Sequence, residues 1–584
     1  MDLPTPFLSE ATYLCLLPII FYFIHLIYMQ IYKKVPKDTK AAVLHGDAVL
    51  TRKWKIAAFL LSALYIIMSS ATEVLKGYGF EPLYHTTAGY LLKLLLLAAG
   101  FLSCYFLICR LLKGFSFQPV SQFKKIGSTP IYLVMIPIIL LSFFCIAGCY
   151  PGIVSSDSAN SWSGVMGGYY DDWHPITYLY ILKVIQKLFD IPYPIIIFQA
   201  VLWIVINQYA LSLLEKYAPY RHIDTNYLII NLLMICSYRA LGNLEKDTLW
   251  NLSVFLFSLC IFDFIKRKKA FPWYKSGLLL LSAWMTATIR HAGDAIVLIT
   301  LFALFLYTTT QKKKKQNKSP IFILVIMLSV LIMKFLLVNL LGFTILKAAP
   351  NEPYVKYSIP MSMIGAIAVN EQPDNKELAV METIMPLKKW QEYYDKYYAD
   401  GISRSYGGIG ETVYKLNDPD VGKDILKLNL RFLLQYPKTY LTAFFDMTSI
   451  VWEMGTPADG YEWMPISIYA STLELHPELS DFYIRRNIST TFQETIVGLS
   501  DKMPIWSSIC WRGGFALFTL LLSTLLLIQK KRGEEALSLL PAFLLAVVLF
   551  LANPSQDPRY INSYQMLVCF FLLYAAYIQR VPAE

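Results

Sequence analysis

Long apolar stretches recur along this 584-residue chain and constrain its fold more than any other feature. A helix needs about 20 apolar residues to cross a bilayer, where only helices and closed barrels satisfy their backbone groups. Charged residues make up 16% of the chain, against about 25% in soluble domains. We therefore expect an all-α polytopic membrane protein with about thirteen transmembrane helices, at 12–31, 55–71, 88–110, 130–149, 194–214, 226–241, 249–265, 275–290, 294–310, 320–342, 511–529, 536–553 and 561–578.

One long polar region interrupts this series before the last three expected spans. It is rich in Tyr and Trp and has helical periodicity in Asn375–Lys396 and Asp424–Tyr440. We expect an inserted extracytoplasmic domain of mainly α character. The chain then divides into an N-terminal three-helix addition, a membrane core, this inserted domain and a C-terminal three-helix segment completing the core, at residues 1–129, 130–342, 343–510 and 511–584.

Short basic runs between the apolar stretches predict the orientation. Lys and Arg cluster at 266–269, 312–315 and 530–532, and the positive-inside rule places such loops in the cytoplasm. The net charge of +11 is thereby explained without a nucleic-acid partner. We expect a multi-pass cell-membrane protein with its N-terminus outside, its C-terminus in the cytoplasm, and four polar loops outside, at 150–175, 242–248, 291–293 and 554–560.

The outer loop at 150–175 holds several acidic residues and no Lys or Arg. Carboxylates at a membrane face are costly unless they are solvated, paired or used. The other outer loops add acids and bases at span ends, whereas transport pathways more often place ionisable groups near mid-membrane. This sidedness favours a surface active site built from Asp157, Asp171, Asp172, His174, Glu245–Asp247, Arg290–His291 and Asp557–Tyr560.

These residues, in this order, resemble the GT-C superfamily, polytopic glycosyltransferases that use polyprenyl-phosphate-linked sugars at the outer membrane face. Within it, the chain is most similar to a bacterial family of large membrane proteins. The likeness covers roughly 130–345 and 511–578, whereas the inserted domain has no matching motif. The matching motifs are Tyr150–Asp157, Asp172–Pro175, Glu245–Asp247, Arg290–His291 and Asp557–Tyr560.

The resemblance implies a GT-C-like membrane core and an essential acid in the first large outer loop. Asp157 is our expected general base. Several GT-C families place a second acid directly beside this residue, and the adjacent pair here is Asp171-Asp172, so these two stay candidates for the base. The alternative for Asp157 is a helix N-cap, because it lies in a run of good capping residues at 155–158.

Substrate binding needs positive charge for the departing phosphate and a pocket for the sugar. Lys246, Arg290 and Arg559 are candidates for the phosphate, since guanidinium groups suit bidentate contacts. The alternative is structural ion pairs with Asp247, Asp294 and Asp557. The expected substrate-binding residues are His174, Trp173, Lys246, Asp247, Arg290, Arg559 and Tyr560.

No metal or other cofactor is expected with certainty. Asp171, Asp172 and His174 have suitable groups for a divalent cation, but their spacing matches no metal motif. The nine cysteines lie in apolar runs or at their ends, which argues against zinc-binding thiolates and a disulfide framework.

We therefore expect a membrane glycosyltransferase that moves a sugar from a polyprenyl-phosphate carrier to a cell-envelope glycan, lipid or protein acceptor. An envelope glycan polymerase or ligase would use similar residues. A polytopic lipid or glycan transporter and a non-catalytic scaffold are the alternatives from other classes.

Overall fold

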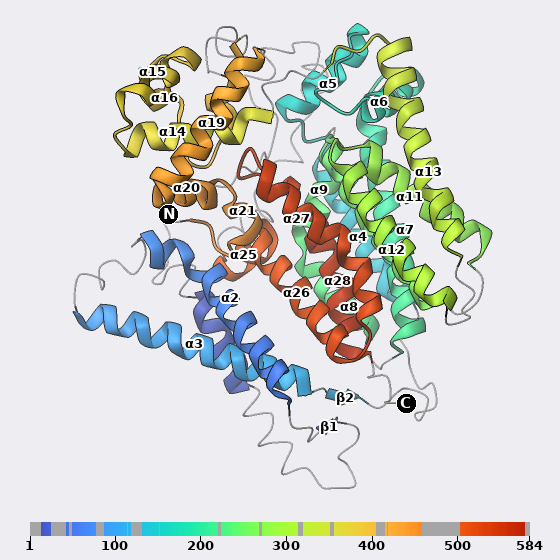
Figure 1. Ribbon diagram of the computed structural model, residues 1–584. Helices are drawn as coiled ribbons and strands as arrows, with labels where there is room; N and C mark the ends of the chain where they lie inside the picture. Colours follow the sequence, from blue (N-terminus) through green and yellow to red (C-terminus); the bar gives the residue numbers. More distant parts are fainter. Residues whose placement is uncertain are drawn as a thin grey trace.

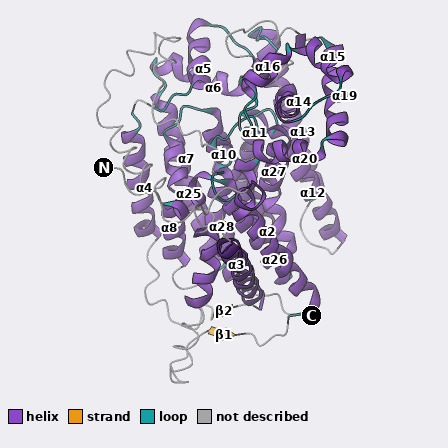
Figure 2. Ribbon diagram, turned by 90° about the vertical axis from the view of Figure 1, so that its left-hand side faces the viewer, coloured by secondary structure: helices purple, strands orange, loops and turns teal. Residues whose placement is uncertain are grey.

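Helices make up nearly all of the described chain in this computed structural model (Figures 1 and 2). The inserted region, like the membrane core, is helical where it is described. The structure describes residues 13–24, 43–45, 50–76, 87–113, 115–117, 131–150, 152–219, 223–267, 271–313, 319–350, 356–404, 415–416, 418–457 and 503–578.

The N-terminal part consists of a short apolar helix, Tyr13–Ile24, and two long helices that pack on each other, α2 (Arg52–Lys76) and α3 (Thr87–Lys113). Helix α2 also packs against α26 of the C-terminal part. The strands β1 (Val43–His45) and β2 (Phe115–Phe117) pair antiparallel. This pairing joins the chain before α2 to the chain after α3.

Helix α10 (Lys246–Lys266) forms the centre of the molecule, and nearly all of its side chains are buried. A helix that is apolar all round is stable only when other helices surround it. Its 21 residues rise about 32 Å, which matches the thickness of a bilayer core. It packs against α7, α11, α27 and α28. Around it stand α4 (Ile131–Gly148), α7 (Tyr193–Tyr217), α8 (Ile223–Leu233), α9 (Ile235–Leu241), α11 (Trp273–Thr288), α12 (Gly293–Lys313), α13 (Pro320–Lys334), α25 (Pro504–Trp511), α26 (Gly513–Gln529), α27 (Leu540–Ala552) and α28 (Asn562–Tyr577).

The outward faces of these helices are apolar. Large side chains such as Val205, Phe302 and Leu328 are more than half exposed. Exposed apolar surface on this scale marks a membrane or protein contact, and here it lies on helices of transmembrane length. Seven described helices are long and apolar enough to cross a membrane, or eight if α25 and α26 form one bent span.

Each of the thirteen expected stretches contains a described helix, which confirms the α-helical class. Several of these helices are too short to count as spans alone. Helix α8 is separated from α9 at Met234, and α25 meets α26 at an angle of 78° at Arg512. The number of crossings therefore stays a prediction.

At one end of the bundle lie the helices of the outer loop, α5 (Ser156–Gly167) and α6 (Ile176–Phe189), with those of the inserted region (Figure 1). The π-helix η4 (Phe335–Ile345) continues α13 and packs against α6. In the inserted region, α14 packs against α16, α17, α19 and α20. Its helices are α14 (Ser358–Asn370), α15 (Asn375–Ile384), α16 (Leu387–Tyr393), α17 (Asp400–Arg404), α19 (Pro419–Gln435), α20 (Pro437–Met447) and α21 (Ser449–Trp452).

The opposite end of the bundle gathers the expected cytoplasmic loops. Lys266 pairs with Glu535 at 2.8 Å, in the 3-10 helix η7 (Gly533–Leu539). Tyr217 donates a hydrogen bond of 2.9 Å to buried Asp263, which also pairs with Lys275. These contacts place the described parts of the loops at one end of the helix bundle. That this end faces the cytoplasm stays a prediction. The described residues in or beside these loops that meet here are Tyr217, Lys266, Lys275, Gln311, Glu534 and Glu535.

Candidate functional site

Helix α5 presents Asp157 at the end of the molecule that carries the outer loops. Its N-cap is Ser155, whose hydroxyl accepts a hydrogen bond from the backbone N–H of Ser158. Asp157 therefore lies in the first turn, where a carboxylate also interacts favourably with the helix dipole. Its side chain forms an ion pair with Arg559 and is not the cap. This finding removes the alternative that Asp157 serves as the N-cap.

Backbone pairing fixes this loop against the start of α10. The N–H of Ile153 donates to the carbonyl of Gly242, and the N–H of Leu244 donates to Ile153, both at 2.9 Å. Gly152 has a φ of 137°, a conformation that favours glycine. The chain passes so close at Gly242 that a Cβ there would lie 2.4 Å from the sulfur of Cys149. The outer loop and the first turn of α10 thus form one unit.

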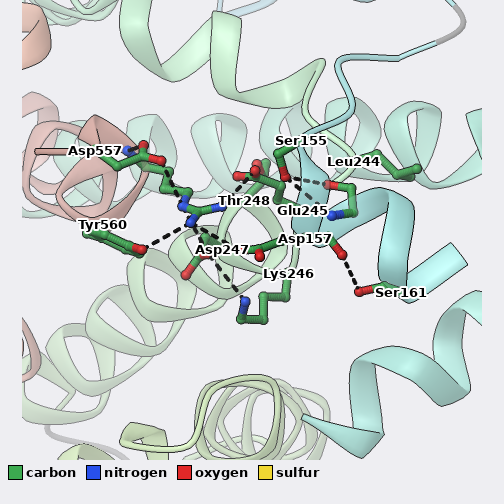
Figure 3. A network of polar contacts seen from close by, with 12 residues as sticks. Ser155, Asp157, Ser161, Leu244, Glu245, Lys246, Asp247, Thr248, Asp557 and Tyr560 are labelled. Carbon is green, nitrogen blue, oxygen red and sulfur yellow. Dashed lines mark hydrogen bonds and ion pairs between the residues drawn. The ribbon is translucent and has the colours of Figure 1, made fainter. Parts of the chain in front are cut away.

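Arg559 lies at the centre of the polar cluster, on the short 3-10 helix η8 (Pro558–Tyr560). Its nitrogens lie 2.8 Å from Glu245, 3.0 Å from Asp557 and 3.1 Å from Asp157. The guanidinium also donates to the hydroxyl of Tyr560 at 3.0 Å. Figure 3 shows these carboxylates converging from α5, the start of α10 and the loop before α28. Segments about 400 residues apart in sequence therefore meet in one site.

Asp247 links Arg559 to the other cations. Its carboxylate lies 3.1 Å from Arg290, and 3.9 Å from both Lys246 and Arg559. The Arg290 guanidinium lies over the rings of Trp250 and Tyr560, at 5.1 and 5.0 Å from their centroids. Such cation–π contacts strengthen when they are desolvated. Both arginines are therefore held in ion pairs. Arg559 pairs with Asp557, as in the alternative to phosphate binding, whereas Arg290 pairs with Asp247 and the expected partner Asp294 pairs with Lys334.

His174 is buried beside Lys246, whose ammonium lies 3.1 Å from Nδ1. Burial, followed by the charge of Lys246, lowers the pKa of His174 to about 3. The imidazole is therefore neutral, so Nδ1 accepts from Lys246 and Nε2 carries the proton. His174 is a hydrogen-bonding residue of the cluster and not a titrating group at neutral pH.

The cluster is nearly balanced in charge. Asp157, Glu245, Asp247 and Asp557 face Arg290, Arg559 and Lys246. Burial raises the pKa of Asp557 to about 7, against the opposing effect of Arg559. A proton on Asp557 therefore neutralises the excess negative charge in slightly acidic solution.

Several buried polar atoms of this cluster lack a hydrogen-bond partner within the described residues. The oxygens of Asp247, Nη1 of Arg290 and Nε of Arg559 have oppositely charged neighbours but no hydrogen bond of good geometry, whereas Nε2 of His174 has neither in the described structure. Buried polar atoms are nearly always hydrogen-bonded in native proteins, so these exceptions need an explanation.

Asp171 and Asp172 lie outside this cluster. Asp171 accepts a hydrogen bond of 3.1 Å from the N–H of Trp173, and the N–H of Asp172 donates to Ala349 at 2.8 Å. Burial raises the pKa of Asp172, with His291 and Lys334 opposing the shift. Lys334 in turn pairs with Asp294. The expected site is therefore divided in two, and Asp157 is the loop acid that contacts the cationic cluster.

No group of three or more His, Cys, Asp or Glu in the described ranges is placed to hold a metal ion. Two of the three weak metal candidates have other partners, because Oδ1 of Asp171 accepts from the N–H of Trp173 and Nδ1 of His174 lies 3.1 Å from Lys246. Trp173 is half-buried beside His174.

Sequence reasoning named Glu245 within a motif but assigned it no role. The structure makes it the partner nearest to Arg559, at the N-cap position of α10. Asn251 was not among the residues expected from the sequence, and its side chain donates to the Arg559 carbonyl at 2.9 Å. The available signal was the position of both residues at the outer end of a buried helix.

No family profile, curated protein sequence or solved structure matches the chain. The functional argument therefore depends on the chemistry of the cluster itself. Carboxylates that can accept a proton lie beside guanidinium and ammonium groups that can hold an anion, in helix ends at one face of a membrane protein.

Proposed function

We propose that this protein is a membrane glycosyltransferase that moves a sugar from a polyprenyl-phosphate carrier to an extracytoplasmic acceptor of the cell envelope. The observation that carries the proposal is the 3.1 Å contact between Asp157 of the first outer loop and Arg559 of the last. It places a candidate base and a candidate phosphate-binding cation in one site, in the loops where GT-C enzymes carry these groups.

Each reacting group has a candidate in the cluster. Asp157 accepts the proton of an acceptor hydroxyl as its oxygen bonds to the anomeric carbon of the sugar. The bond from that carbon to the carrier phosphate breaks, and the phosphate leaves with the bonding electrons. Arg559, Arg290 and Lys246 stabilise the negative charge on the leaving group. A single displacement of this kind inverts the configuration at the anomeric carbon.

The position of the cluster favours this reaction over transport. Its charges lie at the first turn of α10, just after α11 and just before α28. These are helix ends at one face of the bundle, where a lipid-linked donor and a water-soluble acceptor can both arrive. Lys334, which lies in the expected span 320–342, pairs with Asp294 at the same end.

The inserted region is our candidate for acceptor recognition. Its last helices are anchored to the loop that carries Arg559, because Gln556 accepts from Ser449 and donates to the carbonyl of Met447, at 2.8 and 2.9 Å. An acceptor bound by this region would therefore lie beside the cluster.

The pool of lipid-linked sugars in the native host tests this proposal. A strain lacking the gene should accumulate one polyprenyl-phosphate sugar, because its consumer is missing. The wild-type gene should restore the pool, and Asp157→Asn at equal membrane abundance should not. Mass spectrometry of extracted lipids measures the pool and identifies the sugar. An unchanged pool in the deletion strain would count against the donor class.

A further inference from the structure

The guanidinium of Arg559 is surrounded by carboxylates, and both hydrogens of its Nη2 are donated, one to Asp157 and one to the hydroxyl of Tyr560. Each of its three nitrogens lies within 3.1 Å of a carboxylate oxygen: Nε of Asp557, Nη1 of Glu245 and Nη2 of Asp157. A phosphate binds arginine through the same N–H groups, preferably two at once. Both edges of a guanidinium that offer two parallel N–H groups include Nη2, so a phosphate bound by two nitrogens must displace Asp157 or the Tyr560 hydroxyl from Nη2.

The three carboxylates differ in how firmly they are held. The side chains of Glu245 and Asp557 are 6% and 8% exposed, and Asp557 also accepts the backbone N–H of Arg559 at 2.9 Å. The side chain of Asp157 is 23% exposed, and its contact with Arg559 is the longest of the three. Asp157 therefore loses least by separating from the guanidinium.

We propose that Arg559 exchanges the carboxylate of Asp157 for the phosphate of the lipid-linked donor, so that donor binding releases the catalytic base. The proposal rests on the proposed function and adds a coupling between its two main groups. Arg559 acts on both sides of this exchange, as the partner that holds Asp157 before binding and as the ligand of the phosphate afterwards.

The exchange explains how an ion-paired carboxylate can serve as a base. A cation at 3.1 Å favours the charged form of a carboxylate and makes it a poor proton acceptor. When the phosphate takes over Arg559, this stabilisation is lost and Asp157 accepts a proton more readily. The base is then active when donor is bound and suppressed when the site is empty.

The exchange can be measured as a change in phosphate affinity, without following sugar transfer. If Asp157 and phosphate compete for Arg559, removing the charge of Asp157 must tighten phosphate binding. The measurement is a titration of a short-chain polyprenyl phosphate into the full-length protein in lipid nanodiscs, followed by intrinsic tryptophan fluorescence. Asp157→Asn should bind this probe about fivefold tighter than wild type or more, and Arg559→Gln should bind it at least about tenfold more weakly.

Asp294→Asn is the matched control. Asp294 is a carboxylate at the same end of the bundle, 25% exposed and paired with a lysine, but Arg559 is not among its ion-pair partners in the described structure. Its substitution should leave the affinity for the probe unchanged. Asp157→Ser, which also removes the charge, should reproduce the tighter binding and serves if Asp157→Asn does not fold.

The outcomes distinguish a failure of the exchange from a failure of the proposed glycosyltransferase function. Equal or weaker binding by both Asp157 variants, while wild type binds the probe, overturns the exchange alone. If wild type itself does not bind the polyprenyl phosphate, the donor class fails and the exchange fails with it. An equal gain in Asp294→Asn would show a general charge effect and would also overturn the exchange.

Discussion

At the residue scale, burial decides how much the loss of one partner of an ion pair changes the stability of the folded protein. Arg559–Glu245 and Lys389–Glu392 have nearly equal separations, 2.8 and 2.9 Å. The first pair is 15% and 6% exposed, whereas the second is 42% and 55% exposed. Removing one partner of a buried pair leaves a charge without compensation, but an exposed pair is screened by water.

Glu245→Gln should therefore destabilise the protein markedly. We expect a loss of about 2 kcal/mol, because the amide replaces the acceptor of a buried, charge-assisted hydrogen bond of 2.8 Å from Arg559. Glu392→Gln, the matched exposed substitution, should leave stability unchanged. The thermal unfolding midpoint of the detergent-solubilised protein, followed by tryptophan fluorescence, measures both effects. Similar shifts in the two variants would show that Glu245 is no more than a surface partner.

The residues of the cluster could be predicted from loop sidedness, but of their ion pairs only those between neighbours in sequence could, Lys246–Asp247 and Arg559–Asp557. The alternation of basic and polar loops indicated that Asp157, Arg290 and Arg559 would lie at one face. A guanidinium either contacts carboxylates or is open to a ligand. Differences of about one ångström in the separation of segments about 400 residues apart decide between the two. The same limit left Glu245 without an expected role, and it left Asp171 and Asp172 open as alternatives to Asp157 for the base.

At the scale of elements, the site depends on a close backbone contact between the outer loop and α10. Gly242 lies in this contact, and a Cβ there would meet both Cβ and Sγ of Cys149 at 2.6 and 2.4 Å. Gly167, at the end of α5, has open space around its Cβ position. The two glycines therefore test whether α5 must lie against α10.

Gly242→Ala should push the outer loop away from α10. We expect a cost of about 1–3 kcal/mol from overpacking, together with weaker binding of polyprenyl phosphate as the cluster is displaced. Gly167→Ala should change neither property. Unfolding midpoints and the nanodisc titration measure the two effects. A Gly242→Ala protein with wild-type stability would contradict the close packing.

Helix existence was predictable because apolar runs of this length have few other stable structures in a membrane. The break at Met234 was not predictable, because it falls inside the expected span 226–241 in a run without Pro or a long polar insertion. The break at Arg512 coincides with the start of the expected span 511–529, where Gly513 and Gly514 follow. There the buried guanidinium of Arg512 donates to Gln556 of the site loop at 3.2 Å.

At the scale of the whole molecule, the two ends of the bundle carry different chemistry. One end holds the Arg559 cluster and the inserted region, and the other holds the basic loops around Asp263 and Glu535. Exposed Lys388 belongs to the inserted region, and exposed Lys531 lies at the other end. The nine native cysteines are buried, apart from half-buried Cys109, so labelling background should be low.

Cysteine labelling in whole cells tests the predicted orientation. Lys388→Cys should react with a membrane-impermeant maleimide added from outside. Lys531→Cys should react only after the membrane is permeabilised, because the positive-inside rule places its basic loop in the cytoplasm. Labelling of Lys531→Cys alone in intact cells would reverse the orientation and place the cluster on the cytoplasmic face.

The most direct test of the account is the set of envelope glycans made by the native host. Strains carrying a deletion, the wild-type gene, Asp157→Asn or Asp294→Asn are compared at equal membrane abundance by mass spectrometry. The account predicts that the deletion and Asp157→Asn lose the same single sugar modification, while Asp294→Asn keeps it. A full wild-type glycan profile in the Asp157→Asn strain would contradict the assignment of Asp157 as the base.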